Sequence, residues 1–356
     1  MKERASRLIQ AMNLNEHEAV LVYNPSNMFY LSGYTGEGLV LIAQKVWAII
    51  TDFRYTEQAE KQAPVYSVEA TSKDRRESAV VAELCRAHHL DTLYYEDDYL
   101  TVRGLENLRK NVPGIDWKIL AGAPERLRQV KDEDEIACIR KACKITGDAF
   151  ERMLGNIREG MTEKEIALQL EYDMLTHGAD GMAFSTIVAA GANGSLPHAI
   201  PGDYQLRKGD MITMDFGAKC GGYCADMTRT IAFGQPSDEM RRVYDTVLEA
   251  QKRSQAAVMA GKCCEHIDAI ARNYIDQNGY QGRFGHGLGH SLGIDIHESP
   301  RLSQNCSDIL QVNQLVTVEP GIYLPGIGGV RIENTVVVKE GGCEALTLPT
   351  TDLIIL

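Results

Sequence analysis

The segment Met211-Ile-Thr-Met-Asp215-Phe-Gly217 decides the fold, because a related segment follows it later in the chain. Leu315-Val-Thr-Val-Glu319-Pro-Gly321 carries the same kind of apolar run, with an acid and a glycine in the same places, at an offset of 104 residues. A second acidic segment comes after each of them, and Asp226-Met-Thr228 corresponds to Glu333-Asn-Thr335 at an offset of 107. A duplicated strand pair of this kind predicts two related halves.

Helices before these strands repeat as well. Gly160-Met-Thr-Glu-Lys-Glu-Ile166 and Gly261-Lys-Cys-Cys-Glu-His-Ile267 lie at an offset of 101 residues, and each opens a helical pattern. The two patterns end at Gly178 and Gly279, with the same spacing of 18 residues from the opening glycine. We therefore expect two halves that pack about a pseudo-two-fold axis.

The part of the chain before the repeat has a different character. With 356 residues and 44% hydrophobic content, the chain is long enough for about two domains with their own cores. The segment Ala121-Gly-Ala-Pro124 predicts a connection, and the acids in Lys131–Glu135 predict the start of a long helix. We expect an N-terminal α/β domain over residues 1–125 and a C-terminal α+β domain over residues 126–356.

Short apolar runs alternate with amphipathic runs in the N-terminal domain. The apolar runs predict strands at Ala19–Tyr23, Leu39–Ala43, Trp47–Thr51 and Thr92–Tyr95. The amphipathic runs predict helices at Phe53–Gln62, Asp74–His89 and Thr101–Asn111.

Charge and cysteine content limit the classes of function. The net charge of −12 disfavours binding to nucleic acids and to anionic membranes. No apolar run reaches the ~20 residues of a membrane span, and residues 1–10 do not resemble a signal peptide. Nine scattered cysteines predict free thiols in a reducing compartment, and the pair Cys220 and Cys224 lacks the further ligands of a zinc site. We expect a soluble, cytoplasmic protein.

Acids within apolar strands are the most informative residues. An ionised carboxylate among Met, Ile, Val and Phe is costly unless a cation or a hydrogen-bond donor meets it. If the halves face each other, Asp215, Asp226, Glu319 and Glu333 converge, and four close carboxylates repel one another unless divalent metals neutralise them. Two divalent metal ions fit this charge. The alternative is that each acid has its own salt bridge or lies on a solvated face.

A histidine-rich loop could supply a nitrogen ligand. His286, His290 and His297 lie within twelve residues, among glycines that permit close approach of the backbone. Carboxylates together with an imidazole favour manganese, cobalt or iron, and zinc is also compatible. His198 in Ser195-Leu-Pro-His198 is a further, weaker candidate.

The ordered set of these motifs resembles the proline-specific metallopeptidases, aminopeptidase P and prolidase. The motifs are Pro197-His198, Asp215, Asp226, His286-x3-His290, His297-Glu298-x-Pro300, Glu319-Pro320-Gly321 and Arg331-x-Glu333. They span residues 130–356, and the N-terminal domain matches the family in size and α/β pattern. The resemblance implies a pita-bread catalytic domain after a creatinase-like domain, and a homodimer.

The resemblance also assigns roles to residues. Asp215, Asp226, His290, Glu319 and Glu333 would bind the two metals, with Asp226 and Glu333 bridging them. Glu319 would accept a proton, His198 and His297 would lie around the scissile carbonyl, and His286 with Tyr323 would form a wall of the proline pocket. Arg331 would hold a ligand carboxylate, and Arg301 could bind the terminal carboxylate of a substrate.

The expected activity is hydrolysis of the Xaa-Pro bond in short proline-containing peptides. We expect an Xaa-Pro aminopeptidase, with an Xaa-Pro dipeptidase (prolidase) as the alternative. Creatinase works without the carboxylate cluster, and methionine aminopeptidase resembles only the C-terminal part. A pita-bread binding module without catalysis is a further alternative, disfavoured because the whole ligand set is present.

Overall fold

The computed structural model describes residues 2–356 and divides into two compact units, with the division between Arg128 and Gln129. Met1, the first residue of the predicted N-terminal domain, lies outside the described residues. Within residues 2–356 no helix is both long enough and apolar enough to cross a membrane. All nine cysteines are free thiols.

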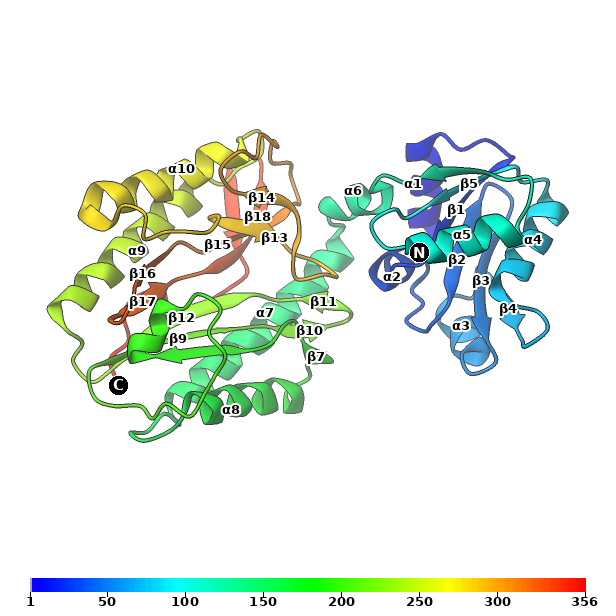
Figure 1. Ribbon diagram of the computed structural model, residues 1–356. Coiled ribbons are helices and arrows are strands. Elements are labelled where there is room, and N and C mark those ends of the chain that lie inside the picture. Colours follow the sequence, from blue (N-terminus) through cyan, green and yellow to red (C-terminus); the bar gives the residue numbers. More distant parts are fainter. Residues whose placement is uncertain (1) are drawn as a thin grey trace. The chain divides into compact units, whose positions relative to one another are not determined.

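The first unit is a six-stranded sheet with helices (Figure 1). Its strand order is β4-β3-β2-β1-β5-β6, with β2 antiparallel to both neighbours and the other pairs parallel. The strands are β1 (Glu18–Val22), β2 (Leu39–Ala43), β3 (Trp47–Asp52), β4 (Ser67–Thr71), β5 (Thr92–Tyr95) and β6 (Asp116–Ile119). The helices are α1 (Lys2–Met12), α2 (Pro25–Ser32), α3 (Thr56–Gln62), α4 (Glu77–His88), α5 (Val102–Asn111) and α6 (Ala123–Gln129).

Every predicted strand and helix of this unit is present, with ends shifted by up to three residues. The central strand β2 is apolar along its whole length, and all five of its residues are buried, because both faces of the sheet are covered there. Sequence reasoning missed α1, α2, α6, β4 and β6, and it interpreted residues 121–124, where α6 begins, as a connection. The two missed strands lie at the edges of the sheet and are polar, so they lack the apolar run of a central strand.

The second unit contains four long or medium helices around small sheets. The helices are α7 (Glu133–Leu154), α8 (Glu163–Thr176), α9 (Asp238–Ala257) and α10 (Cys264–Ile275), with short helical turns η1 (Gly191–Ser195) and η2 (Asp276–Tyr280). The strands of the first half are β7 (Gly181–Met182), β8 (Ile187–Ala190), β9 (Asp210–Phe216), β10 (Ala218–Cys220), β11 (Tyr223–Cys224) and β12 (Met227–Phe233). Those of the second half are β13 (Gly289–Ser291), β14 (Glu298–Leu302), β15 (Leu315–Val318), β16 (Gly321–Leu324), β17 (Gly328–Arg331), β18 (Asn334–Lys339) and β19 (Gly342–Ala345).

The predicted internal repeat is confirmed in the backbone. Helix α7 packs beside α8, and α9 beside α10, and Figure 1 shows the strands enclosed by these two helix pairs. Gly160 and Gly261, before α8 and α10, both have φ of +83°, a left-handed conformation that favours glycine. The antiparallel pairs β9–β12 and β15–β18 are the two repeated ribbons.

The long helix α7 begins where the acids predict it. The Asp132 carboxylate accepts from the Glu135 amide at 2.9 Å, and the Glu135 carboxylate accepts from the Asp132 amide at 2.9 Å. This capping box satisfies two amides that have no partner inside the helix.

A buried arginine joins the two halves. Arg229 on β12 is 1% exposed, and its guanidinium donates to the carbonyls of Thr228, Glu333, Pro349 and Thr350 and to the Asn334 side chain. Burial lowers its pKa to about 10, which still leaves the group charged at neutral pH. The side chain therefore links β12 to the start of β18 and to the C-terminal segment.

We expect Arg229→Met to lower the free energy of unfolding by about 3 kcal/mol or more, because several buried carbonyls lose their donor. Urea unfolding at pH 7 measures this loss. Arg241→Met is the control, since the Arg241 side chain is half-exposed and its guanidinium pairs with Asp245 on its own helix. Equal stability of the two variants would contradict the role of Arg229.

Candidate metal centre

Five ligand-type side chains from both halves meet in the second unit. Asp215 is on β9, His290 on β13, Asp226 directly precedes β12, Glu319 directly follows β15, and Glu333 lies between β17 and β18. Ligand atoms of Asp226, His290 and Glu333 lie within 4.8 Å of one another, and all three residues are buried. His290 Nε2 lies 3.5 Å from Asp226 Oδ2 and 3.4 Å from Glu319 Oε1.

Repeated threonines hold the two acids that come from equivalent places in the halves. Thr228 donates its hydroxyl to Glu333 Oε2 at 2.7 Å, and Thr335 donates its hydroxyl to the Asp226 carbonyl at 2.9 Å. Thr228 and Thr335 are themselves repeat-related, so each half positions the acid of the other. Sequence reasoning aligned these threonines but gave them no role.

A single cation pairs with the carboxylate cluster. Arg331 Nη2 donates to Asp215 Oδ2 at 2.7 Å, and its side chain is 5% exposed. The same guanidinium donates to the Thr228 hydroxyl and to the Tyr323 hydroxyl. Arg331 therefore contacts one carboxylate of the four and compensates only part of their charge.

The remaining carboxylates are buried at an electrostatic cost. Burial and the neighbouring Glu333 raise the pKa of Asp226 well above its usual range, and burial with Glu319 does the same to the pKa of Glu333. Burial raises the pKa of Glu319 to about 8, against the opposing effect of Arg331. Without further positive charge the cluster therefore favours protonated carboxyl groups.

Two buried oxygens lack partners in this cluster. Among residues 2–356, Asp215 Oδ1 and Glu333 Oε1 have no hydrogen-bond partner. A buried carboxylate oxygen without a donor is costly, and a cation is the partner that would satisfy both oxygens at once. The donor set therefore fits divalent metal ions bound by carboxylates and one imidazole.

The orientation of His290 suits a ligand. Its Nδ1 lies 3.1 Å from the Ser291 carbonyl, which can only accept, so Nδ1 carries the proton. Burial lowers the pKa of His290 to about 4. The neutral ring therefore presents the lone pair of Nε2 to Asp226 and Glu319, and this arrangement is typical of metal-binding histidines.

Around the acids lies a cavity of about 600 Å³. Its lining includes ten of the eleven predicted site residues: His198, Asp215, Asp226, His286, His290, His297, Arg301, Glu319, Arg331 and Glu333. Its apolar lining residues, which sequence reasoning did not identify as part of a site, include Phe184, Ile187, Ile200, Pro201 and Ile296.

Tyr323 is the predicted residue that does not line this cavity. The Gly287 carbonyl can only accept, so His286 Nδ1 carries the proton and donates to it, and the Tyr323 hydroxyl donates to His286 Nε2 at 2.8 Å. Burial lowers the pKa of His286 to about 4, so the ring is neutral. Tyr323 thus supports His286 from behind, while His286 itself is part of the wall.

His297 and Arg301 lie on the open side of the metal-ligand cluster. The rings of His290 and His297 meet edge to face, with centroids 4.5 Å apart. Partial burial and the nearby Arg301 lower the pKa of His297. Arg301 is exposed and forms no salt bridge with any described residue.

The buried carboxyls predict an unusual pH dependence for the metal-free protein. Glu319 has a pKa of about 8 in the folded state and of 4.5 in the unfolded state. Between these pH values the Glu319 carboxyl therefore binds more protons in the folded state than in the unfolded state. The buried His286 and His290 have the opposite effect on stability only below pH 6.5, where they bind protons in the unfolded state but not in the folded state. From pH 6.5 to 8 the free energy of unfolding should fall by about 1.4 kcal/mol per pH unit for each such proton.

Urea unfolding with a chelator, at several pH values between 6.5 and 8, measures this decrease. Added Mn²⁺ should remove it, because a bound cation replaces the protons. Stability of the chelated protein that rises over this range would contradict the account of the cluster.

Comparisons with known proteins agree with this geometry. Residues 137–340 match the model of metallopeptidase family M24, and residues 4–130 match the creatinase/prolidase N-terminal domain. The chain is 35% identical to an Xaa-Pro dipeptidase from Pyrococcus furiosus over 357 residues, covering 99% of this chain and 100% of the relative.

Two solved structures are similar over almost the whole chain. An Xaa-Pro dipeptidase from Bacillus anthracis superimposes with a TM-score of 0.95 at 39% identity, covering 99% of each chain. An X-Pro aminopeptidase from Thermotoga maritima superimposes with a TM-score of 0.92 at 38% identity, covering 99% of this chain and 100% of that one. The family resemblance seen in the sequence is thereby confirmed. The chain belongs to metallopeptidase family M24, and it is a peptidase with a creatinase-like N-terminal domain and a pita-bread catalytic domain.

Proposed function

We propose that this protein is an Xaa-Pro dipeptidase that binds two divalent metal ions. The observation that carries the metal part is the buried cluster of four carboxylates and one imidazole, of which two oxygens lack any donor. Asp215, Asp226, His290, Glu319 and Glu333 would be the ligands, with Asp226 and Glu333 shared between the metals. When bound, the metals supply an acidified water as nucleophile and polarise the scissile carbonyl.

The surrounding side chains would act on the peptide directly. Glu319 would accept the proton of the attacking water. His297 and His198 line the open part of the cavity, where each could donate to the developing oxyanion. Arg331 would hold Asp215 in place, and His286, supported by Tyr323, would form the wall against the proline ring.

The choice between dipeptidase and aminopeptidase rests on Arg301 and on the relatives. Several similar proteins are named Xaa-Pro dipeptidase or prolidase, and one is named X-Pro aminopeptidase. These names favour the dipeptidase, which the sequence alone ranked second. Arg301 supports it chemically, because an arginine without an acidic partner on the cavity wall can bind the terminal carboxylate of a dipeptide.

Removing one shared carboxylate tests the metal part. We expect Glu333→Gln to lower metal affinity and kcat by about a hundredfold or more, because a neutral amide cannot replace a carboxylate shared by two cations. Metal analysis after dialysis, with kinetics on an Xaa-Pro dipeptide, provides both readouts. Glu340→Gln, an exposed acid in the following turn, is the control. Two retained metals with normal turnover in Glu333→Gln would refute the dinuclear proposal.

Substrate length tests the dipeptidase part. Arg301→Ala should lower kcat/KM for an Xaa-Pro dipeptide by about tenfold or more, the loss of a charge-assisted hydrogen bond. The effect on an Xaa-Pro-Xaa tripeptide should be smaller, because its carboxylate lies one residue further away. Equal effects would remove Arg301 from carboxylate recognition. If the wild-type enzyme prefers the tripeptide, it is an aminopeptidase and the dipeptidase proposal is wrong. Rapid cleavage of Xaa-Ala peptides would contradict the proposed proline specificity.

Three further expectations complete the proposal. Manganese as the metal, with cobalt, iron or zinc as alternatives, follows from the oxygen-rich donor set. A homodimer follows from the family resemblance, and a cytoplasmic location from the nine free cysteines.

A further inference from the structure

A buried lysine contacts both strands of the hairpin that carries His290 and His297. Lys131 lies just before helix α7, and its side chain is 1% exposed. Its ammonium donates to Ser291 Oγ at 3.2 Å and to Glu298 Oε2 at 3.1 Å. Ser291 directly follows His290 on β13, and Glu298 directly follows His297 at the start of β14.

The ammonium is well satisfied in this position. Its third contact is the Gln129 carbonyl at 3.4 Å, and the Lys131 amide donates to the Asn313 carbonyl at 3.0 Å. Both the backbone and the ammonium of Lys131 are therefore fixed. The side chain of Glu298, which accepts from the Lys131 ammonium, is also buried, at 8% exposed.

The carboxylate of Glu298 also organises the loop between the two strands. Its Oε1 accepts from the Asp295 amide at 3.2 Å. A Cβ at Gly293 would lie only 2.8 Å from this carboxylate, so a glycine is needed for the close approach. The pairing of β13 and β14 is irregular between His290 and Ser291, so backbone hydrogen bonds alone do not fix the separation of the two strands there.

We propose that Lys131 is a positioning residue that sets the distance between the metal-ligand histidine His290 and the oxyanion histidine His297. The inference rests on the proposed function for the roles of the two histidines. Lys131 touches neither the cavity nor the cluster of ligand carboxylates; it acts through Ser291 and Glu298 on the two rings, whose centroids lie 4.5 Å apart. A displacement of about 1 Å at a catalytic group can cost about a hundredfold in rate.

A pair of variants separates positioning from stability. Lys131→Met removes the Lys131 ammonium from the buried Glu298 carboxylate, so it should both destabilise the protein and lower kcat. The double variant Lys131→Met/Glu298→Leu removes both charges, and replacing a buried ion pair by apolar side chains often restores stability. We expect the double variant to recover most of the melting temperature, to keep its metals, and to retain a kcat about 10- to 100-fold below wild type with a KM changed less than threefold.

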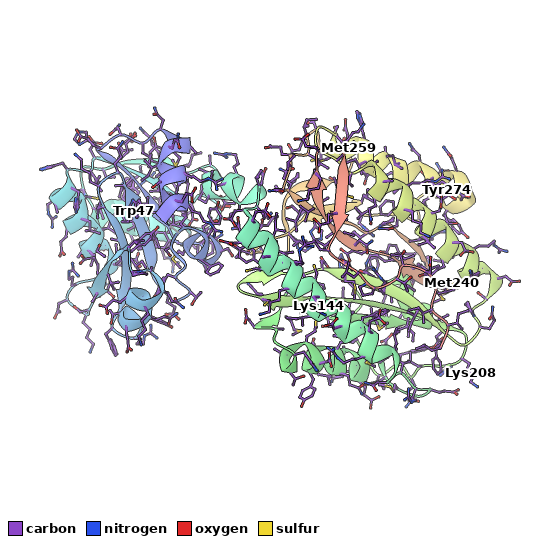
Figure 2. The ribbon with its side chains drawn as sticks, turned by 180° about the vertical axis from the view of Figure 1, so that it is seen from behind. Trp47, Lys144, Lys208, Met240, Met259 and Tyr274 are labelled. Carbon is purple, nitrogen blue, oxygen red and sulfur yellow. The ribbon has the colours of Figure 1, made fainter. Side chains whose placement is uncertain are left out.

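Lys144→Met is the matched control. Lys144 lies on α7 in the same unit, is exposed, and pairs only with Asp148 one turn later (Figure 2). This variant should match wild type in melting temperature and in kcat.

A crystal structure of the double variant provides a readout that does not depend on the substrate. The centroids of His290 and His297 should be further apart than 4.5 Å, or the His297 ring should occupy more than one position. A double variant with wild-type kcat, or with unchanged ring spacing and a single His297 position, would overturn the positioning role. A wild-type enzyme inactive on Xaa-Pro peptides would instead refute the proposed function, and the ring spacing would still decide the role of Lys131.

Discussion

The rest of the catalytic unit depends on mutual repulsion among carboxylates that are buried together. Asp226 and Glu333 are 5% and 1% exposed, and burial together with their acidic neighbours raises the pKa of each. Arg331 pairs with Asp215 and leaves the other three acids without a formal positive charge in contact. Such a cluster is stable only with protons or metal ions, so the fold holds a site whose occupation changes its own stability.

The internal repeat explains how four acids reach one place. Each half contributes a ribbon with an acid on or beside the first strand and another before the second strand. Thr228 of one half bonds the Glu333 carboxylate of the other, and Thr335 bonds the Asp226 carbonyl in return. Arg229 on β12 also joins the two halves, because its buried guanidinium donates to the Glu333 carbonyl and to the Asn334 side chain at the start of β18. Side chains from both halves thus hold the buried carboxylates, and both halves line the cavity.

The elements that could be predicted from the sequence are those with a recognisable pattern of neighbouring residues. Strand β2 is apolar throughout, and glycines recur at equivalent places before α8 and α10, so both features are visible in the sequence. The polar edge strands β4 and β6 leave none, because an edge strand needs no continuous apolar run. The clustered acids stood out in the sequence because an ionised carboxylate within an apolar strand is costly unless a cation or a hydrogen-bond donor meets it. Lys131 did not, because a lysine at the start of a helix is usually solvated, and only the tertiary structure brings Ser291 and Glu298 to it.

The number of metal ions in the carboxylate cluster tests this account most directly. Crystals grown with Mn²⁺ and measured at the manganese absorption edge would give anomalous difference peaks at each bound ion. Two peaks are expected inside the cavity, among the side chains of Asp215, Asp226, His290, Glu319 and Glu333. A single peak, or no peak while the acids keep their positions, would contradict a dinuclear centre.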